Sequence, residues 1–197
     1  KQSDGFGNLD TILNIEGVEA TNFDDNIFGT NGDNSLDGRL GNNTIDGRSG
    51  FDFVEYNGSG RHNVNVDLAS GASSFTKGAD GQLYTDTLIN IEGIIGSDNN
   101  DVLSGNSAAN KIYGASGDDE IRGGDGDDFI DSGSGNDFVY GENGDDIIEQ
   151  SGSGTQHYDG GPGTDTYSIN TSFLPSHFDA QIEVNLVSGL SGLANDQ

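Results

Sequence analysis

One apolar residue recurs every nine positions along most of this chain. The phase holds in an early block and returns from residue 96 onward, after which one extra residue, Gln150, precedes the last two units. The positions are Ile27, Leu36, Ile45 and Val54, then Leu103, Ile112, Ile121, Ile130, Val139, Ile148, Tyr158 and Tyr167. Each is the middle one of the three residues that close a unit, which is the pattern of a minimal strand with one inward side chain.

The first six residues of each unit are rich in glycine and acids. Eleven of the twelve units carry Asp or Asn at the sixth position: Asp25, Asn34, Asn43, Asp52, Asp101, Asn110, Asp119, Asp128, Asp137, Asp146 and Asp165, with Gln156 as the exception. Closely spaced glycines favour turns with positive φ. A unit is therefore a turn plus a short strand, and two units complete one coil of a flattened solenoid. The pattern predicts an all-β fold of stacked parallel strands around a thin core of Ile, Leu and Val ladders.

The segment between the two blocks, residues 56–95, interrupts the period and resembles both ends of the chain. It contains a strand-like stretch at residues 63–68, and residues 182–189 repeat residues 64–71. Its later part, residues 86–94, repeats residues 10–18. We expect four parts: a first repeat block with a half-insert (1–55), a strand-containing insert (56–95), a main block (96–169) and a second half-insert (170–197). Because the two half-inserts complement each other, we expect a segment of a longer tandem array, which joins neighbouring modules or end-to-end copies.

The charge of the chain decides which partners suit it. Asp and Glu number 34 against seven Lys and Arg, for a net charge of -27. This excludes binding to the nucleic-acid backbone or to an anionic membrane surface, and no apolar run is long enough to span a membrane. Leu, Ile, Val and Phe make up only 45 residues, close to the composition of chains that cannot fold by burial alone. Such a chain attracts cations.

The stacking of the turns points to calcium. With two units per coil, Asp101, Asp119, Asp137 and Gln156 fall on one edge of the solenoid, and Asn110, Asp128, Asp146 and Asp165 fall on the other. Carboxylates at the spacing of neighbouring strands, about 4.8 Å, repel each other unless a cation lies between them. Oxygen ligands in flexible turns suit Ca²⁺, whereas Mg²⁺ needs a tighter octahedron. The three histidines lie off the ladder and cysteine is absent, so zinc is not indicated.

The units resemble the calcium-binding nonapeptide repeat GGxGxDxUx of RTX proteins, most closely at Gly123-Gly-Asp-Gly-Asp-Asp-Phe-Ile-Asp131. The resemblance implies a right-handed parallel β-roll, a calcium-binding β-solenoid in two repeat blocks. It also implies several Ca²⁺ ions, each held by carbonyls from the first four turn positions and by carboxylates from the sixth.

Carried over to this sequence, the resemblance implies four ions in the main block. The first has Gly124, Gly126 and Asp128 with Gly141, Asn143 and Asp146; the second has Ala115, Gly117 and Asp119 with Ser132, Ser134 and Asp137. The third has Ser97, Asn99 and Asp101 with Gly114, Ser116 and Asp119; the fourth has Glu142, Gly144 and Asp146 with Gly160, Pro162 and Asp165. Further candidate ligands are Asn110, Gly123 and Asp125 in this block and Asp25 and Asp52 in the first. We expect Gln156 and the extra Gln150 to weaken their site, and the first block to bind fewer ions.

These observations favour a structural module over an enzyme. We expect no catalytic activity, because no His, Cys or Ser constellation stands apart from turn, ligand or core positions. The resemblance implies a calcium-induced folding module of a large secreted bacterial protein (adhesin, toxin, surface-layer or matrix protein) that leaves the cell by type I secretion. The alternative is an auxiliary module of an extracellular enzyme such as a protease or an alginate epimerase. Ice binding is set aside, because no Thr occupies the third position of a unit.

Overall fold

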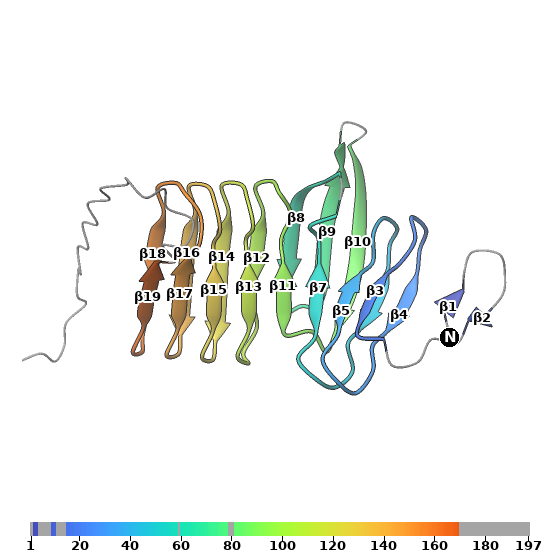
Figure 1. Cartoon of the computed structure of the whole chain (residues 1–197), viewed down its shortest axis with the longest axis horizontal. Helices are drawn as coiled ribbons and strands as arrows, with labels where there is room; N and C mark the ends of the chain where they lie inside the picture. Colours follow the sequence, from blue (N-terminus) through green and yellow to red (C-terminus); the bar gives the residue numbers. More distant parts are fainter. Residues whose placement is uncertain (1, 4–8, 11–14, 59, 79–80, 170–197) are drawn as a thin grey trace, which may run out of the picture.

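The computed structural model describes residues 2–3, 9–10, 15–58, 60–78 and 81–169, and every regular element within them is a β-strand. Two sheets face each other and form a β-solenoid whose strands run parallel except within the insert (Figure 1). The eight-stranded sheet has the order β19 (Thr166–Ile169), β17 (Ile147–Gln150), β15 (Phe129–Asp131), β13 (Lys111–Tyr113), β11 (Gly93–Ile95), β7 (Phe53–Glu55), β5 (Ser35–Asp37) and β3 (Gly17–Glu19). The fold predicted from the nine-residue period is thereby confirmed.

The nine-stranded sheet lies opposite. Its order is β18 (His157–Asp159), β16 (Phe138–Asn143), β14 (Glu120–Asp125), β12 (Val102–Ser104), β8 (Arg61–Asp67), β9 (Ala72–Lys77), β10 (Gln82–Ile89), β6 (Thr44–Asp46) and β4 (Asn26–Phe28). A separate antiparallel pair, β1 (Gln2–Ser3) and β2 (Leu9–Asp10), completes the described strands.

The core is the ladder of eighth-position side chains. In the strand pairs, Leu103 aligns with Ile121 and Ile121 with Val139, so equivalent residues of successive coils lie side by side. All three are completely buried. No single unit buries more than one such side chain, so stability comes from stacking. The second half-insert expected at residues 170–197 lies outside the described residues.

The insert adds three strands to the nine-stranded sheet and a single strand to the other. Strand β8 pairs in parallel with β12 and β10 pairs in parallel with β6, while β9 runs antiparallel between β8 and β10. The nine-stranded sheet therefore has β10, β9 and β8 between β6 and β12, where the opposite sheet has only β11 between β7 and β13. Strands β9 and β10 are longer than most repeat strands and extend past them in Figure 1.

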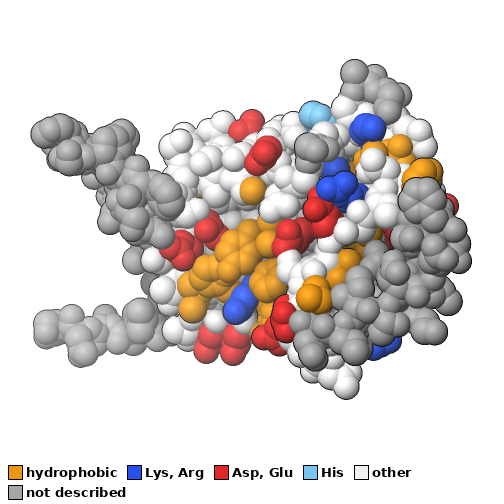
Figure 2. Space-filling view, turned by 45° about the vertical axis from the view of Figure 1, so that its right-hand side comes forward, with side chains coloured by type: hydrophobic (Ala, Val, Ile, Leu, Met, Phe, Trp, Pro, Cys, Tyr) orange, Lys and Arg blue, Asp and Glu red, His pale blue; other side chains and the backbone are white. Residues whose placement is uncertain are grey.

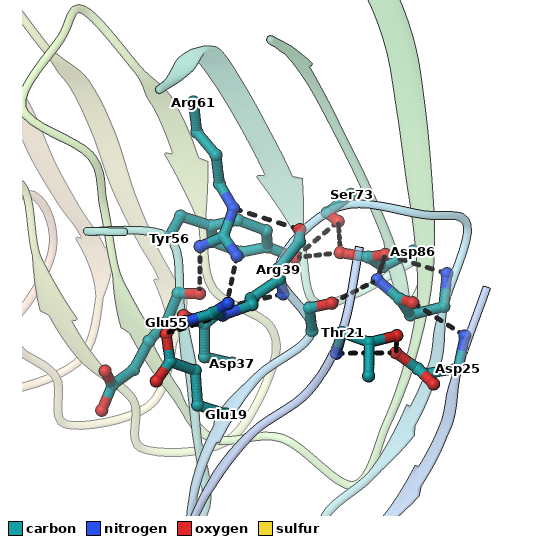
Figure 3. Close-up of polar contacts among 12 residues, drawn as sticks. Glu19, Thr21, Asp25, Asp37, Arg39, Glu55, Tyr56, Arg61, Ser73 and Asp86 are labelled. Carbon is teal, nitrogen blue, oxygen red and sulfur yellow. Dashed lines mark hydrogen bonds and ion pairs between the residues drawn. The ribbon is translucent and has the colours of Figure 1, made fainter. Parts of the chain in front are cut away.

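A buried arginine joins the insert to the first block. Arg61, only 3% exposed, forms an ion pair with Asp37 and donates to the carbonyls of Arg39 (3.2 Å) and Glu55 (3.0 Å). Its guanidinium also lies 5.5 Å from the centre of the Tyr56 ring. Figure 3 shows how these groups converge from the two parts of the chain. Because this positive charge is buried together with its partners, the contact between the insert and the first block depends on Arg61.

Outward side chains form an aromatic row. Ring centres are 5.4 Å apart between Phe51 and Phe53, 6.1 Å between Phe53 and Tyr113, and 5.8 Å between Tyr113 and Phe129. Figure 2 shows one face of the molecule on which apolar side chains gather between acidic ones.

Within the described residues, no helix is long and apolar enough to cross a membrane.

Candidate metal-binding turns

The sixth-position residues form two continuous ladders along the edges of the solenoid. On one edge, the main-chain N–H of Asp101 donates to Oδ1 of Asp119 at 2.8 Å, and that of Asp119 to Oδ1 of Asp137 at 3.1 Å. On the other edge, the same contact links Asn110 to Asp128 (2.7 Å), Asp128 to Asp146 (2.9 Å) and Asp146 to Asp165 (3.1 Å). The structure thus brings together the residues that the two-unit coil predicted.

The second carboxylate oxygen of five ladder residues has no hydrogen-bond partner. These are the Oδ2 atoms of Asp52, Asp119, Asp128, Asp137 and Asp146. Each of these residues is no more than 2% exposed. Buried polar atoms are nearly always paired, so five equivalent exceptions mark positions where a further group belongs.

Four of the unpaired oxygens, those of Asp52, Asp119, Asp128 and Asp146, face carbonyls of the next coil across a glycine. A side chain placed on Gly114 would have its Cβ 2.7 Å from Oδ2 of Asp119 and 2.5 Å from the carbonyl oxygen of Ser132. Gly123 stands in the same way between Asp128 and the carbonyl of Gly141. Because glycine has no side chain, it leaves a cradle between a carboxylate and a carbonyl that repeats along the ladder.

The backbone conformation of the second turn residue separates two kinds of turn. In the turns with an unpaired oxygen, which we call open turns, the second residue is left-handed: Arg48 (φ 75°), Ala115 (φ 74°), Gly124 (φ 113°), Gly133 (φ 77°) and Glu142 (φ 71°). In closed turns, the second residue has an ordinary φ and its N–H donates to the sixth side chain. The closed pairs are Thr21 with Asp25 (2.9 Å), Thr30 with Asn34 (2.6 Å), Ser97 with Asp101 (2.6 Å) and Asn106 with Asn110 (2.8 Å). All five turns with a free, buried carboxylate oxygen thus have a left-handed second residue. The same conformation occurs at Arg39 (φ 55°) and Gly161 (φ 92°), whose sixth residues are Asn43 and the exposed Asp165.

Burial makes the negative charge of the open turns unfavourable. It raises the pKa of Asp119 to about 8, against the effect of a hydrogen bond from the Asp101 main chain, and neighbouring carboxylates raise this pKa further. In the same way, burial raises the pKa of Asp128 to about 7 and the pKa of Asp52 to about 6. A cation among these groups offsets both the burial and the repulsion.

Main-chain carbonyls would complete the coordination. No group of three or more His, Asp or Glu side chains in the described part of the chain is placed to hold a metal by itself. Of the expected carbonyl ligands, Ala115 accepts from the N–H of Ser134 (3.0 Å) and Ser134 accepts from the N–H of Gly117 (2.9 Å). Asn143 and Pro162 accept in the same way from Gly126 and Gly144. Each carbonyl oxygen retains a second lone pair for a hard cation such as Ca²⁺.

The expected sites differ in how well the structure prepares them. The ions expected at Asp128, at Asp119 and at Asp146 each have a free oxygen that faces a carbonyl of the next coil, from Gly141, Ser132 and Gly160. At the third expected site, Asp101 already accepts from the N–H and the hydroxyl of Ser97 (2.6 and 2.9 Å).

The turn after Asp137 is modified in another way. There the Nε2 of Gln156 donates to the carbonyl of Gly135 at 3.0 Å, and its Oε1 accepts from Gln150 at 2.8 Å. An amide nitrogen thus faces a carbonyl that a ligand set would use. The expectation that Gln150 and Gln156 weaken this site stays a prediction.

Two ladder residues escaped the sequence reasoning. Oδ1 of Asp86 accepts from the N–H of Asn43 (3.0 Å), and Oε2 of Glu92 accepts from the N–H of Asp52 (3.0 Å). Both lie in the insert, outside the nine-residue period. The available signal was an acid followed two positions later by an apolar residue, since Asp86 precedes Leu88 and Glu92 precedes Ile94 at the spacing found in every repeat.

Comparison with known families agrees with this geometry. The family model of the RTX calcium-binding nonapeptide repeat, which comprises four copies of the repeat, matches residues 19–54, 95–130 and 113–148. These ranges cover turns of both blocks and omit most of the insert. No curated protein matches the chain.

Proposed function

Through both of its repeat blocks the chain belongs to the RTX calcium-binding nonapeptide-repeat family, and we propose that it is a calcium-folded structural module of a large secreted bacterial protein. The calcium-binding repeats and the solenoid are the premise. The proposal adds that the parent protein is an adhesin, toxin, surface-layer or matrix protein, and that calcium drives the folding of the module.

The observation that carries the proposal is the set of five buried, unpaired carboxylate oxygens. We propose ions between the turns of Asp119 and Asp137, of Asp128 and Asp146, and of Asp146 and Asp165, with carbonyls of the same turns as further ligands. Each ion would supply the positive charge that these ladders lack. The third ion expected in the main block, between the turns of Asp101 and Asp119, should be weaker because Ser97 already bonds Asp101.

Calcium-dependent folding would suit export. Extracellular calcium modules have dissociation constants of about 10⁻⁴ to 10⁻³ M, so their sites are empty inside a cell and filled outside. An ion that binds only the folded state stabilises it by mass action, and several sites increase the effect. An unfolded chain within the cell and a folded one outside it agree with type I secretion.

The neighbours of the module would set the activity of the whole protein. We propose that the module has no catalytic role of its own, because its phased residues serve as turn, strand or ladder residues. In the described part of the chain, β3 and β19 end one sheet and β4 and β18 end the other. Neighbouring modules or further copies could continue the stack at such strands. The alternative, an auxiliary module of an extracellular protease or alginate epimerase, differs only in having a catalytic neighbour.

The test is a calcium titration of the chain followed by far-ultraviolet circular dichroism. We expect a largely unfolded spectrum in EGTA and a β-rich one in millimolar calcium, with magnesium as the control for general ionic screening. The same folded spectrum in EGTA and in calcium would contradict calcium-driven folding.

A further inference from the structure

We infer that Asp52 and Glu92 form a separate site for a hard divalent cation, at the point where the first block meets the insert. The inference rests on the proposed function for its choice of calcium. It differs from the repeat sites because one of its carboxylates comes from outside the nonapeptides: Glu92 lies between the matched ranges 19–54 and 95–130.

Asp52 supplies half of this site. It is completely buried, and its Oδ2 has no partner. Its turn is open, since Arg48 at the second position is left-handed with φ 75°. A Cβ on Gly47 would lie 2.6 Å from Oδ2 of Asp52 and would overlap the carbonyl oxygen of Asn90, so the cradle of the repeat turns is present here as well.

The facing group is a shortened turn. The N–H of Gly47 donates to the carbonyl of Ile89 at 3.0 Å, which keeps the register of the repeats. Three residues, 90–92, then replace the usual six, and the Oε2 of Glu92 takes the ladder position next to Asp52. Two carboxylates and the Asn90 carbonyl thus converge, and the longer Glu side chain spans the distance that a full turn would otherwise cover.

The shortened turn leaves space beside these groups. A cavity of about 260 Å³ is lined by Leu68, Leu88, Asn90, Ile91, Glu92 and Asn106. It adjoins both Asn90 and Glu92, and it is large enough for several water molecules. Calcium takes six to eight oxygen ligands and accepts water among them. Water molecules in this cavity would therefore supply the ligands that the protein does not.

The opposite edge of the same junction has its own positive charge. There the Arg61 guanidinium pairs with Asp37 and with the carbonyls of Arg39 and Glu55. Among the described residues, neither Asp52 nor Glu92 has an ion pair with Lys or Arg. One edge of the junction is therefore neutralised by the protein itself, and the other requires a cation from solution.

The ladder changes character beyond Glu92. Its next member is Asn110, whose Nδ2 donates to the main-chain carbonyl of Glu92 at 3.0 Å. An amide replaces the carboxylate there, so the repulsion ends at Glu92. The bound ion would fix the last turn of the first block to the segment that leads into the main block.

The experiment counts bound calcium by calorimetry on the full chain. We expect Glu92→Gln and Asp52→Asn each to bind one ion fewer than the wild type. The matched control is Glu16→Gln: Glu16 has the same local sequence, Asn-Ile-Glu-Gly, but is exposed and has Asn34 as its ladder neighbour. It should keep the full number of ions. Hydrogen exchange at residues 47–52 and 90–93 should become faster in Glu92→Gln and in Asp52→Asn, but not in Glu16→Gln.

The double variant Asp52→Asn/Glu92→Gln guards against a folding defect, since it removes the repulsion together with the ion. We expect it to fold with one ion fewer than the wild type. An unchanged ion count in Glu92→Gln would overturn the inference. The proposed function would still stand in that case if Asp128→Asn loses an ion in the same assay. A wild-type chain that binds no calcium would overturn both.

Discussion

At the scale of the residue, the turns that keep a free, buried carboxylate oxygen at the sixth position share a left-handed residue at the second. A left-handed conformation costs a non-glycine residue about 1–2 kcal/mol, yet Arg48, Ala115 and Glu142 adopt it. In each of these turns the sixth carboxylate is left with a free, buried oxygen. Ser97, with an ordinary φ, instead satisfies Asp101 by its own N–H and hydroxyl. Three of the four strained second residues therefore lie in turns that keep an oxygen available; the fourth is Arg39, whose sixth residue is Asn43.

We predict that Asp128→Asn weakens calcium binding more than Asp101→Asn does. The first change removes a charge from an open turn and keeps the acceptor for Asn110, whereas the second removes a charge that Ser97 already stabilises. We expect the calcium midpoint of Asp128→Asn to rise about tenfold, equivalent to ~1.4 kcal/mol, in a titration followed by circular dichroism. Equal shifts for the two variants would show that open and closed turns do not differ as ligands.

At the scale of the element, each edge of the solenoid behaves as one titrating ladder. The folded-state pKa values of Asp119 (about 8), Asp128 (about 7) and Asp52 (about 6) lie above the ordinary value of 3.8, chiefly because of burial. The calcium-free fold therefore binds protons more tightly than the unfolded chain does. Its stability is greatest below the ordinary pKa and is lost as the pH rises through 6 to 8.

We predict opposite effects of pH with and without calcium. In EGTA, the β-signal should be stronger at about pH 5 than at about pH 8, because protonation removes the buried charges. In calcium, the apparent affinity should be higher at about pH 8 than at about pH 6, because protons compete for the same oxygens. Titrations at both pH values, monitored by circular dichroism, measure the two effects. A calcium midpoint independent of pH would contradict ligation by these carboxylates.

At the scale of the whole molecule, the insert joins two calcium-dependent blocks by ordinary packing. Val64, Val66, Phe75 and Leu88 are buried in it. The Tyr56 hydroxyl lies 2.5 Å from the Ser73 hydroxyl and 3.2 Å from the Asp86 carboxylate. These contacts and the Arg61 cluster need no metal, so this part of the molecule should respond to mutation differently from the ladders.

We predict that Arg61→Met destabilises the protein by about 3 kcal/mol even in saturating calcium, because it leaves Asp37 buried without its partner. The matched control is Arg122→Met: Arg122 pairs with Glu120 and Glu142, but its side chain is 41% exposed, so its loss should change stability by less than about 1 kcal/mol. Urea unfolding in excess calcium measures both variants. Recovery of Arg61→Met to wild-type stability by calcium would contradict a metal-independent joint.

The repeating architecture follows from the amino-acid sequence alone. A local period fixes the solenoid because each unit contributes one apolar side chain, such as Ile121, and one ladder acid, such as Asp119. The stacking of identical units then brings equivalent residues together, so the all-β class, the two edges and the pairing of Asp128 with Asp146 all followed from the spacing. The ligand sets expected from the RTX resemblance remain predictions, with the free oxygens as their support.

The placement of the insert and the identity of the open turns depend on long-range packing, which no local pattern in the sequence specifies. The position of β8 to β10 depends on pairings between strands far apart in the sequence, and these pairings bring Asp86 and Glu92 into ladders to which no period assigns them. In the same way, Arg61 meets Asp37 because the insert adds three strands to one sheet and only one to the other. The free oxygen of each open turn depends on the φ of its second residue. Ala115 shows that this φ is imposed by the stacked coils, because the residue type alone favours the opposite conformation.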